Sequence, residues 1–396
     1  MWNGLSPAAG GLPPLNFIAN PPLALYVHIP WCVRKCPYCD FNSHERKDTL
    51  PERAYIKTVL EDLDGELPRV WGRNLESVFI GGGTPSLFSA QSIDDLLIGI
   101  RSRLRCKPDM EITLEANPGT AEAGRFADYA AAGVNRLSIG AQSFDNDRLA
   151  ALGRIHDGRQ AAAAAEMAHK AGLGNFNLDL MFGLPGQRVD GALRDIRRAM
   201  DLEPAHISHY ELTLEPNTLF HAQPPGLPED EMVGRMLETC LEALSAGGYG
   251  RYEVSAYARE GRRCRHNLNY WRFGDYLGIG AGAHGKLTLP ARRRIERNHK
   301  RKHPQAYLDG PKRESGRTAL TQQDAALEFM MNALRLVEGV PSELFTMRTG
   351  LPLDFIRPTL QWARSEGLMV EDATRLATTQ RGYAHLNTLL AHFSDS

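Results

Sequence analysis

Three cysteines lie within eight residues near the start of the chain, and together they could bind a metal ion or a metal cluster. They are Cys32, Cys36 and Cys39, in the stretch YVHIPWCVRKCPYCDF. Thiolates are soft, charged donors that bind iron–sulfur clusters and zinc. Three buried cysteines on one helix face are the alternative, but Pro37 directly follows the second cysteine and would interrupt a helix. We therefore predict a ligand-binding loop that follows a strand.

The number of cysteines points to the kind of site. A four-iron cluster offers one iron to each ligand, so three cysteines leave one iron open to another molecule. The pattern C-x3-C-x2-C, with Tyr38 before the last cysteine, resembles the signature of the radical S-adenosylmethionine (SAM) enzymes. This resemblance implies a [4Fe-4S] cluster whose open iron chelates SAM, and whose electron cleaves SAM to methionine and a 5′-deoxyadenosyl radical. Zinc is the alternative, but it usually takes a fourth protein ligand, and Cys106, Cys240 and Cys264 are isolated in the sequence.

The composition limits the class of protein. A length of 396 residues suggests two or three domains, and 42% hydrophobic residues can form a sizeable core. The net charge of −1 gives no bias towards nucleic acid or membrane. No apolar run reaches the ~20 residues of a membrane span, and no Lys or Arg precedes Arg34, so we expect no signal peptide. We predict a cytoplasmic protein with no membrane span that does not bind nucleic acid.

Short β-forming segments alternate with helix-forming segments through the first half of the chain. The predicted strands are Leu23–Ile29, Ser77–Ile80, Met110–Ala116, Val134–Ile139, Asn175–Met181 and His206–Leu212. The predicted helices lie at about 51–67, 89–104, 120–132, 157–171 and 189–202. Such alternation predicts right-handed βαβ units and a parallel sheet. Six units fit an α/β fold, a partial (β/α)6 barrel, which is the radical SAM barrel implied by the resemblance; a full eight-unit barrel and an open doubly wound sheet are the alternatives.

Polar residues follow the predicted strands at their carboxyl ends, where parallel barrels place their chemistry. The second strand ends in Gly81-Gly82-Gly83-Thr84, where glycine lets backbone approach a ligand closely. Glu115, Gln142 and Asp179 stand at the next three strand ends. Polar residues that converge on one ligand from several strand ends suit SAM. Asp179 and Gln142 could bind the ribose hydroxyls, and Arg154 could bind the methionine carboxylate.

Several motifs resemble, in order, those of the oxygen-independent coproporphyrinogen III oxidase family. They are YVHIPWC, GGGTPS, LEANPG, the GAQSF turn, LGRIH and NLDLMFGLPGQ, and the resemblance covers most of residues 23–340. It implies that SAM is contacted by Tyr26, Tyr38, Gly82, Gly83, Thr84, Glu115, Gln142, Arg154 and Asp179, with Thr213 as a further contact.

Two departures favour a sister family, the radical SAM haem chaperones. Phe41 stands where the oxidases carry a fourth cysteine, and only about 22 residues precede the first predicted strand. The stretch HNLNYW from His266 fits the H-N-x-x-Y-W motif of that family. The resemblance implies haem binding, with His266 as the candidate ligand, Cys264 and His284 as weaker ones, an electron donor, and client haem proteins such as respiratory enzymes. A true oxidase, which would make protoporphyrinogen IX, and a radical SAM enzyme with another substrate are the alternatives.

The remaining segments complete the predicted domains. We expect a flexible tail (1–22), a barrel with its extension (23–304), a linker (305–320) and a winged-helix-like α+β domain (321–396). A helix at Asp324–Val337 presents Phe329, Met330, Leu334 and Val337 on one face, and a β-wing is expected near Leu368–Ala377. The basic run 292–303 is expected to be a solvated face or loop, and it could pair with haem propionates or an acidic partner.

Overall fold

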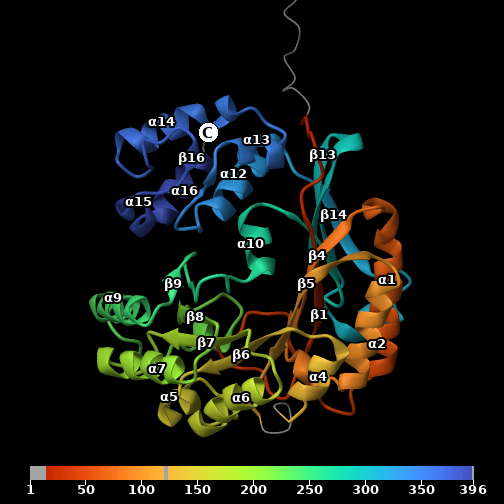
Figure 1. The fold of residues 1–396 in the computed structure, drawn as a ribbon, viewed down its shortest axis with the longest axis vertical. Coiled ribbons are helices and arrows are strands. Elements are labelled where there is room, and N and C mark those ends of the chain that lie inside the picture. The colour runs from red at the N-terminus through yellow and green to blue at the C-terminus, as the bar shows by residue number, and fades with distance from the viewer. Residues whose placement is uncertain (1–14, 120–123, 395–396) are drawn as a thin grey trace, which may run out of the picture.

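A mixed sheet of twelve strands runs through the computed structural model, which describes residues 15–119 and 124–394 (Figure 1). Six neighbouring strands at its centre are parallel. They are β1 (Leu23–Ile29), β4 (Asn74–Gly82), β5 (Arg105–Ala116), β6 (Arg136–Gln142), β7 (Phe176–Phe182) and β8 (His206–Glu211). These are the six strands that the sequence predicts, and β1 has the predicted bounds.

Each parallel strand is followed by a helix on the outer side of the curved sheet (Figure 1). The helices are α1 (Glu52–Val70), α2 (Ala90–Arg101), α4 (Phe126–Ala132), α6 (Gly158–Lys170), α7 (Val189–Asp201) and α9 (Asp230–Ala246). The partial (β/α)6 barrel is therefore confirmed. The predicted start of the third helix, residues 120–123, lies outside the described residues.

Short elements connect these units near the carboxyl ends of the strands. They are β2 (Trp31–Cys32), β3 (His44–Glu45), the 3-10 helix η1 (Pro85–Leu87), α5 (Asn146–Ala151) and α8 (Leu219–Ala222). The barrel core forms between the helices and strands such as β1, which is buried on both faces along nearly its whole length. A continuous apolar run is typical of such doubly covered parallel strands.

The sheet extends beyond the barrel at both edges. At one edge β10 (Ala256–Ala258) pairs antiparallel with β8 and with β9 (Gly250–Arg251). At the other edge β11 (Asp275–Ile279) is parallel to β1, and β12 (His284–Leu289), β13 (Arg294–Lys300) and β14 (Glu314–Ala319) continue antiparallel. The smaller elements here are α10 (Arg265–Trp271), η2 (Pro290–Arg292) and α11 (Pro304–Asp309). The segment 305–320, predicted as a linker, is instead most of a helix and an edge strand.

The basic run 292–303 is mostly a sheet strand, contrary to the predicted solvated face or loop. Lys300 at the end of β13 is 2% exposed. Its ammonium contacts two carboxylates of α1, Asp62 Oδ1 at 2.6 Å and Glu66 Oε1 at 3.0 Å. Arg294 and Arg297 are also paired with acidic side chains. Lys300 is therefore neutralised inside the protein and cannot reach a haem propionate, whereas Arg294 and Arg297 are paired but partly exposed.

A second core belongs to the C-terminal domain, which lies at the upper left in Figure 1. Its elements are α12 (Gln322–Ala333), β15 (Val340–Pro341), α13 (Glu343–Thr349), η3 (Leu353–Ile356), α14 (Arg357–Ser365), β16 (Arg375–Leu376), α15 (Gln380–Ala384) and α16 (Leu386–Ser394). The predicted wing corresponds to β16 and the Met369–Thr378 bridge. Phe329, Met330 and Leu334 are buried as predicted, but Val337 is 40% exposed, because α12 ends at Ala333.

Part of the predicted tail is packed against this domain. Residues 1–14 lie outside the described residues. Leu15 is 5% exposed and belongs to the second core, and the Asn16 amide donates a 2.9 Å hydrogen bond to the Gly350 oxygen.

All six cysteines are free. Among the described residues, no helix is long and apolar enough to cross a bilayer.

The buried ion pairs of β13 predict a large effect of one substitution. Lys300→Met removes the cation and leaves Asp62 and Glu66 without their common partner, so we expect a loss of about 3–5 kcal/mol in the free energy of unfolding. Urea denaturation at pH 7 measures this. Lys302→Met, two residues away and exposed, is the matched control and should change stability by at most about 0.5 kcal/mol. Equal stability of the two variants would contradict the structural role of Lys300.

Candidate metal-cluster and cofactor site

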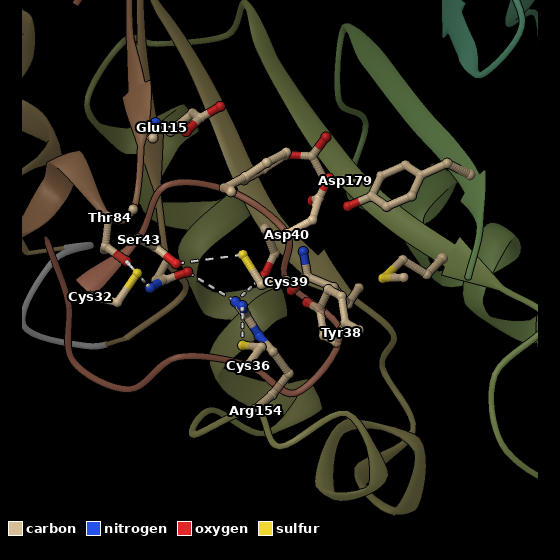
Figure 2. A pocket seen from close by; sticks show the side chains of 18 of the residues that line it. Cys32, Cys36, Tyr38, Cys39, Asp40, Ser43, Thr84, Glu115, Arg154 and Asp179 are labelled. Carbon is tan, nitrogen blue, oxygen red and sulfur yellow. Dashed lines mark hydrogen bonds between the residues drawn. The ribbon is translucent and has the colours of Figure 1, made fainter. Parts of the chain in front are cut away.

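A cavity of about 330 Å³ opens at the carboxyl ends of the parallel strands, and the three cysteines of the predicted cluster line it (Figure 2). Cys32, Cys36 and Cys39 come from the loop after β1, as predicted. All but one of the predicted SAM residues line the same cavity: Tyr38, Gly82, Gly83, Thr84, Glu115, Gln142, Arg154, Asp179 and Thr213. The strand ends thus bring together residues that are up to 181 positions apart, from Cys32 to Thr213.

Polar side chains stand beside the three cysteine sulfurs (Figure 2). Thr84 Oγ1 donates to Cys32 Sγ at 3.6 Å, and Arg154 Nη1 donates to Cys36 Sγ at 3.7 Å. Ser43 Oγ lies 3.7 Å from Cys39 Sγ. Burial raises the pKa of Cys32 to about 11 and also raises the pKa of Cys39. Because metal ligation needs thiolates, cluster binding would displace protons from these buried thiols.

The arrangement of the thiols distinguishes a cluster from a single ion. Among the described residues, no group of three or more His, Cys, Asp or Glu side chains is placed to hold one metal ion. A mononuclear zinc site needs its ligands gathered around one centre. A four-iron cluster takes each thiolate on a different iron, so its ligands lie farther apart. Three thiolates on one loop therefore suit a cluster with one open iron.

The glycine turn after β4 packs directly against the cysteine loop. A Cβ atom on Gly83 would lie 2.6 Å from the backbone oxygen of Trp31, and one on Gly82, whose φ is +122°, would lie 2.7 Å from the His28 ring. The amides of Gly83 and Thr84 donate to the Ile29 and Trp31 oxygens at 2.8 Å. Only glycine fits this close approach. The turn therefore positions the cysteine loop as well as lining the cavity.

Two carboxylates on the far side of the cavity differ in their partners. Glu115 accepts a 2.9 Å hydrogen bond from the Gly82 amide, and burial raises its pKa to about 8. Asp179 accepts hydrogen bonds from Ser138 Oγ and Asn177 Nδ2, both at 2.9 Å, and burial raises its pKa as well. Asp179 is held in place by these two donors and by Ser208. Glu115 is neutral at pH 7 in this cavity and would become ionised beside a cation.

Two buried polar atoms on the cavity wall have no hydrogen-bond partner, and they test whether a cofactor fits. They are Oε1 of Gln142 and Nε of Arg154. Gln142 follows an irregularity in the β6–β7 register and has a φ of +59°, a strained value for a side-chain-bearing residue. A buried acceptor and a buried cationic donor suit the hydroxyl and carboxylate groups of SAM. The residues present therefore fit a cluster bound to three thiolates with SAM beside it.

The structure also shows what the sequence prediction missed. Tyr26 does not line the cavity; its hydroxyl lies 3.0 Å from His28 Nδ1, and its ring packs on Phe79. Asn117, Ser138, Met181 and Tyr210 do line it, although the sequence analysis did not single them out. Three of them stand two or four residues from a predicted site residue on the same strand end, so the two-residue period of a strand could have identified them.

His266 is enclosed by protein in this structure. Its side chain is 1% exposed, with Nδ1 2.9 Å from Ser77 Oγ and Nε2 3.1 Å from the Tyr270 hydroxyl. Burial lowers its pKa to about 3. Cys264 is also buried, and its thiol donates to Glu111 at 3.6 Å. His284 is exposed and stacks on His299. In this conformation neither nitrogen of His266 is free to bind iron.

Comparison with known families places two parts of the chain. The profile of the radical SAM superfamily matches residues 26–199, and that of the HemN C-terminal domain matches residues 320–385. The first covers the barrel strands from β1 to β7 and the cysteine loop. The second covers the α12–α15 region of the C-terminal domain.

Curated relatives match almost the whole chain. The heme chaperone HemW of Escherichia coli is 51% identical over 373 residues, which cover 94% of this chain and 98% of that protein. The heme chaperone HemW of Haemophilus influenzae is 50% identical, with the same coverage of both chains. The HemW of Bacillus subtilis is 33% identical over 90% of this chain and 95% of that one.

A solved structure shares the fold. It is that of the coproporphyrinogen III oxidase HemN from Escherichia coli, described as a radical SAM enzyme. The TM-score is 0.79, and the match covers 95% of this chain and 90% of the other. At 22% sequence identity this likeness shows the fold alone.

The cysteine geometry predicts which thiols hold iron. Cys36→Ser removes one of the three thiolates, so anaerobic reconstitution should leave the variant with at most a small fraction of the wild-type iron and sulfide. Cys106→Ser is the matched control, because Cys106 lies on β5 and does not line the cavity. Iron and sulfide analysis and the visible absorbance of the cluster measure the effect. Full iron and sulfide in Cys36→Ser would refute the assignment.

The raised pKa of Glu115 predicts a pH dependence of SAM binding. At pH 7 the carboxyl is protonated, and a ligand that brings positive charge favours the carboxylate. SAM binding should therefore release a proton, and its affinity should rise by up to about tenfold per pH unit until about pH 8, then level off. Calorimetry of the reconstituted protein in buffers of different ionisation enthalpy measures this proton release.

Glu115→Gln is the control for this prediction. The α-amino group of SAM titrates in the same pH range, so the result lies in the difference between the wild type and the variant. The variant should retain only the dependence that belongs to SAM itself. Identical proton release by both proteins would show that Glu115 does not ionise on binding.

Proposed function

The chain belongs to the family of the HemW heme chaperones, and on this premise we propose that it binds haem and passes it to client haem proteins. The carrying observation is the near-full-length match to proteins described as heme chaperones, at up to 51% identity. The radical SAM site is part of the same proposal: Cys32, Cys36 and Cys39 hold a [4Fe-4S] cluster. Respiratory enzymes are the proposed clients, and the cytoplasm is the proposed location.

In this proposal SAM lies against the open side of the cluster. Tyr38, Gly82, Gly83, Thr84, Glu115, Gln142, Arg154, Asp179 and Thr213 contact it from the cavity wall. The cluster and SAM supply whatever one-electron chemistry the protein performs. The residues of the chain orient SAM: Arg154 faces its carboxylate and Asp179 its ribose. Tyr26 acts indirectly, by holding His28 behind the glycine turn.

A second pocket offers a place for haem. We call it the seam pocket, because it lies where α10, the β11–β13 edge and α12 meet. Its volume is about 270 Å³, and it is lined by Tyr270, Trp271, Phe273, Gly274, Tyr276, Lys286, Arg297 and Asn332. Sites that enclose a drug-sized ligand measure roughly 300–1,000 Å³. We therefore propose that the seam pocket receives one edge of the haem rather than the whole macrocycle.

The chemistry of the seam pocket suits the edge of a flat, anionic aromatic molecule. Four aromatic side chains line it, and aromatic rings pack well against a porphyrin. The indole N–H of Trp271 is buried without a hydrogen-bond partner, so it is a donor in need of an acceptor. Arg297 is partly exposed but already pairs with Glu328. A haem propionate would accept from Trp271 and share Arg297 with that carboxylate.

The oxidase is the alternative, and one residue of the cavity argues against it. Phe41, at the position of the fourth oxidase cysteine, is 59% exposed and lines the mouth of the cluster cavity. A phenyl ring supplies neither the metal-binding nor the hydrogen-bonding chemistry of a thiol at that position. The solved oxidase shares the fold at 22% identity, which carries no argument about its substrate here.

One paired anaerobic experiment tests the proposed function. The reconstituted protein receives haem in one sample, and coproporphyrinogen III with SAM and a reductant in the other. We expect a Soret band that saturates at a fixed ratio of haem to protein, with transfer of that haem to an apo haem protein, and no carbon dioxide from the second sample. Multiple turnovers to protoporphyrinogen IX would identify an oxidase instead.

The same titration tests the seam pocket. Trp271→Ala removes the aromatic face and the unpartnered donor together, so haem affinity should fall by about tenfold or more. Trp71→Ala is the matched control, because Trp71 is 83% exposed and is not among the residues that line the pocket. Equal haem affinity of Trp271→Ala and the wild type would remove the seam pocket from the proposal while leaving haem binding itself intact.

A further inference from the structure

A further hollow, separate from the cluster cavity and the seam pocket, lies on the outer side of the cysteine loop. Its volume is about 600 Å³. It is lined by Arg34, Lys35, Cys36, Pro37, Cys39, Ala150, Ala151, Gly153, Asn217, Thr218, Leu219 and Phe220. We call it the outer hollow. Cys36 and Cys39 line both the outer hollow and the cluster cavity, so the cysteine loop is the wall that separates them.

The charge of the outer hollow has one sign. Arg34 and Lys35 are exposed, and no Asp or Glu is among the described residues that line the hollow. The ammonium of Lys35 donates to the backbone oxygen of Phe41 at 3.4 Å. Neither cation forms an ion pair with a carboxylate in the described part of the chain. Both side chains are therefore available to another molecule at the hollow, and Arg34 lines the cluster cavity as well.

The floor of the hollow is apolar and held in place. Leu219 is 56% exposed, and Pro37, Ala150 and Phe220 lie around it. The Phe220 amide donates to the Pro37 oxygen at 3.0 Å, which ties α8 to the cysteine loop. Gly153, with a φ of +68°, approaches Pro37 so closely that a Cβ there would lie 2.9 Å from its ring. An apolar floor with a cationic rim is typical of a protein-binding surface.

We propose that the outer hollow is the docking surface of a one-electron carrier protein whose redox group is surrounded by acidic residues. The inference rests on the proposed cluster at the three cysteines. One electron leaves the reduced carrier and enters the cluster, which passes from the 2+ to the 1+ state, and no bond or proton is transferred. Because ligand side chains line the hollow itself, the electron path from a docked carrier to the cluster is short.

The charges of the hollow select the sign of the partner. Arg34 and Lys35 attract an acidic surface during the encounter, and the apolar floor holds it after docking. Haem fits the hollow less well, because among its described lining residues there is no histidine and only one aromatic ring. A second copy of the chain would have to bring an acidic, apolar surface of its own, and an oligomerisation measurement separates that case.

Two substitutions test the docking surface from different sides. Lys35→Glu reverses a rim charge, and Leu219→Glu places a charge on the floor, away from the cysteine loop. The probe is flavodoxin hydroquinone, mixed anaerobically with the reconstituted protein in a stopped-flow instrument. At low salt we expect both variants to be reduced about tenfold more slowly than the wild type, with the Lys35→Glu difference fading as screening increases. Arg197→Glu reverses an exposed charge on α7, and flavodoxin hydroquinone should reduce this variant at the wild-type rate.

Two further readouts separate docking from other effects. The midpoint potential of the cluster and its reduction by photoreduced 5-deazariboflavin, a small neutral donor, should be the same in all the proteins. Oxidised flavodoxin should bind the cluster-free wild type and Arg197→Glu more tightly than the two hollow variants, as seen by calorimetry at low salt.

The outcomes decide between the inferences. Equal rates of reduction by flavodoxin in the wild type and both hollow variants would overturn the docking surface. The same conclusion would follow if the hollow variants were reduced by 5-deazariboflavin as slowly, relative to the wild type, as they are by flavodoxin. A chain that forms dimers, lost in Leu219→Glu, would overturn it in favour of a self-interface. Failure to reconstitute any cluster would overturn the proposed function and would be visible before flavodoxin is added.

Discussion

The contact between the backbone of the glycine turn and the backbone of the cysteine loop is the constraint on which the site depends. The amides of Gly83 and Thr84 hydrogen-bond to the end of β1 and to the start of the cysteine loop. A side chain at Gly83 would collide with the Trp31 oxygen. This contact places Thr84 against the sulfur of Cys32 and the Gly82 amide against Glu115. One close approach of two loops thus aligns a cysteine, its hydrogen-bond donor and a titratable carboxylate.

The close packing of the sheet extension also decides where buried charges are paired. The sheet extension brings a basic strand, β13, against the barrel helix α1, and a buried cation there is stable only with its carboxylates. Lys300 has two of them, Asp62 and Glu66. In the neighbouring strands β12 and β11, Lys286 contacts Asp275 at 3.1 Å, and both side chains are almost fully buried. Arg34 and Lys35, by contrast, are exposed beside the proposed cluster, and the hollow that they line has no carboxylate among its described residues.

The sequence predicts the barrel well because its signals are local. The bounds of β1 follow from one apolar run, and the strand ends follow from the order of polar residues along the chain. The rest depends on pairing between distant segments. The segment 305–320 is polar and reads as a linker, but β14 pairs with β13 and so joins the sheet. The backbone strain at Gln142 comes with an irregular register between β6 and β7, which no single segment reveals.

The HNLNYW motif shows how local sequence and tertiary structure can disagree about one residue. The motif marks His266 as a haem ligand, whereas the structure holds its Nε2 against the hydroxyl of Tyr270. Tyr270 also lines the seam pocket. In the proposed function, a haem edge in this pocket would meet Tyr270, and displacing its hydroxyl would release the imidazole nitrogen behind it. Burial already keeps this imidazole neutral, which is the form that binds iron. The position of Tyr270 thus offers a physical route by which the enclosed His266 becomes a ligand only when haem is present.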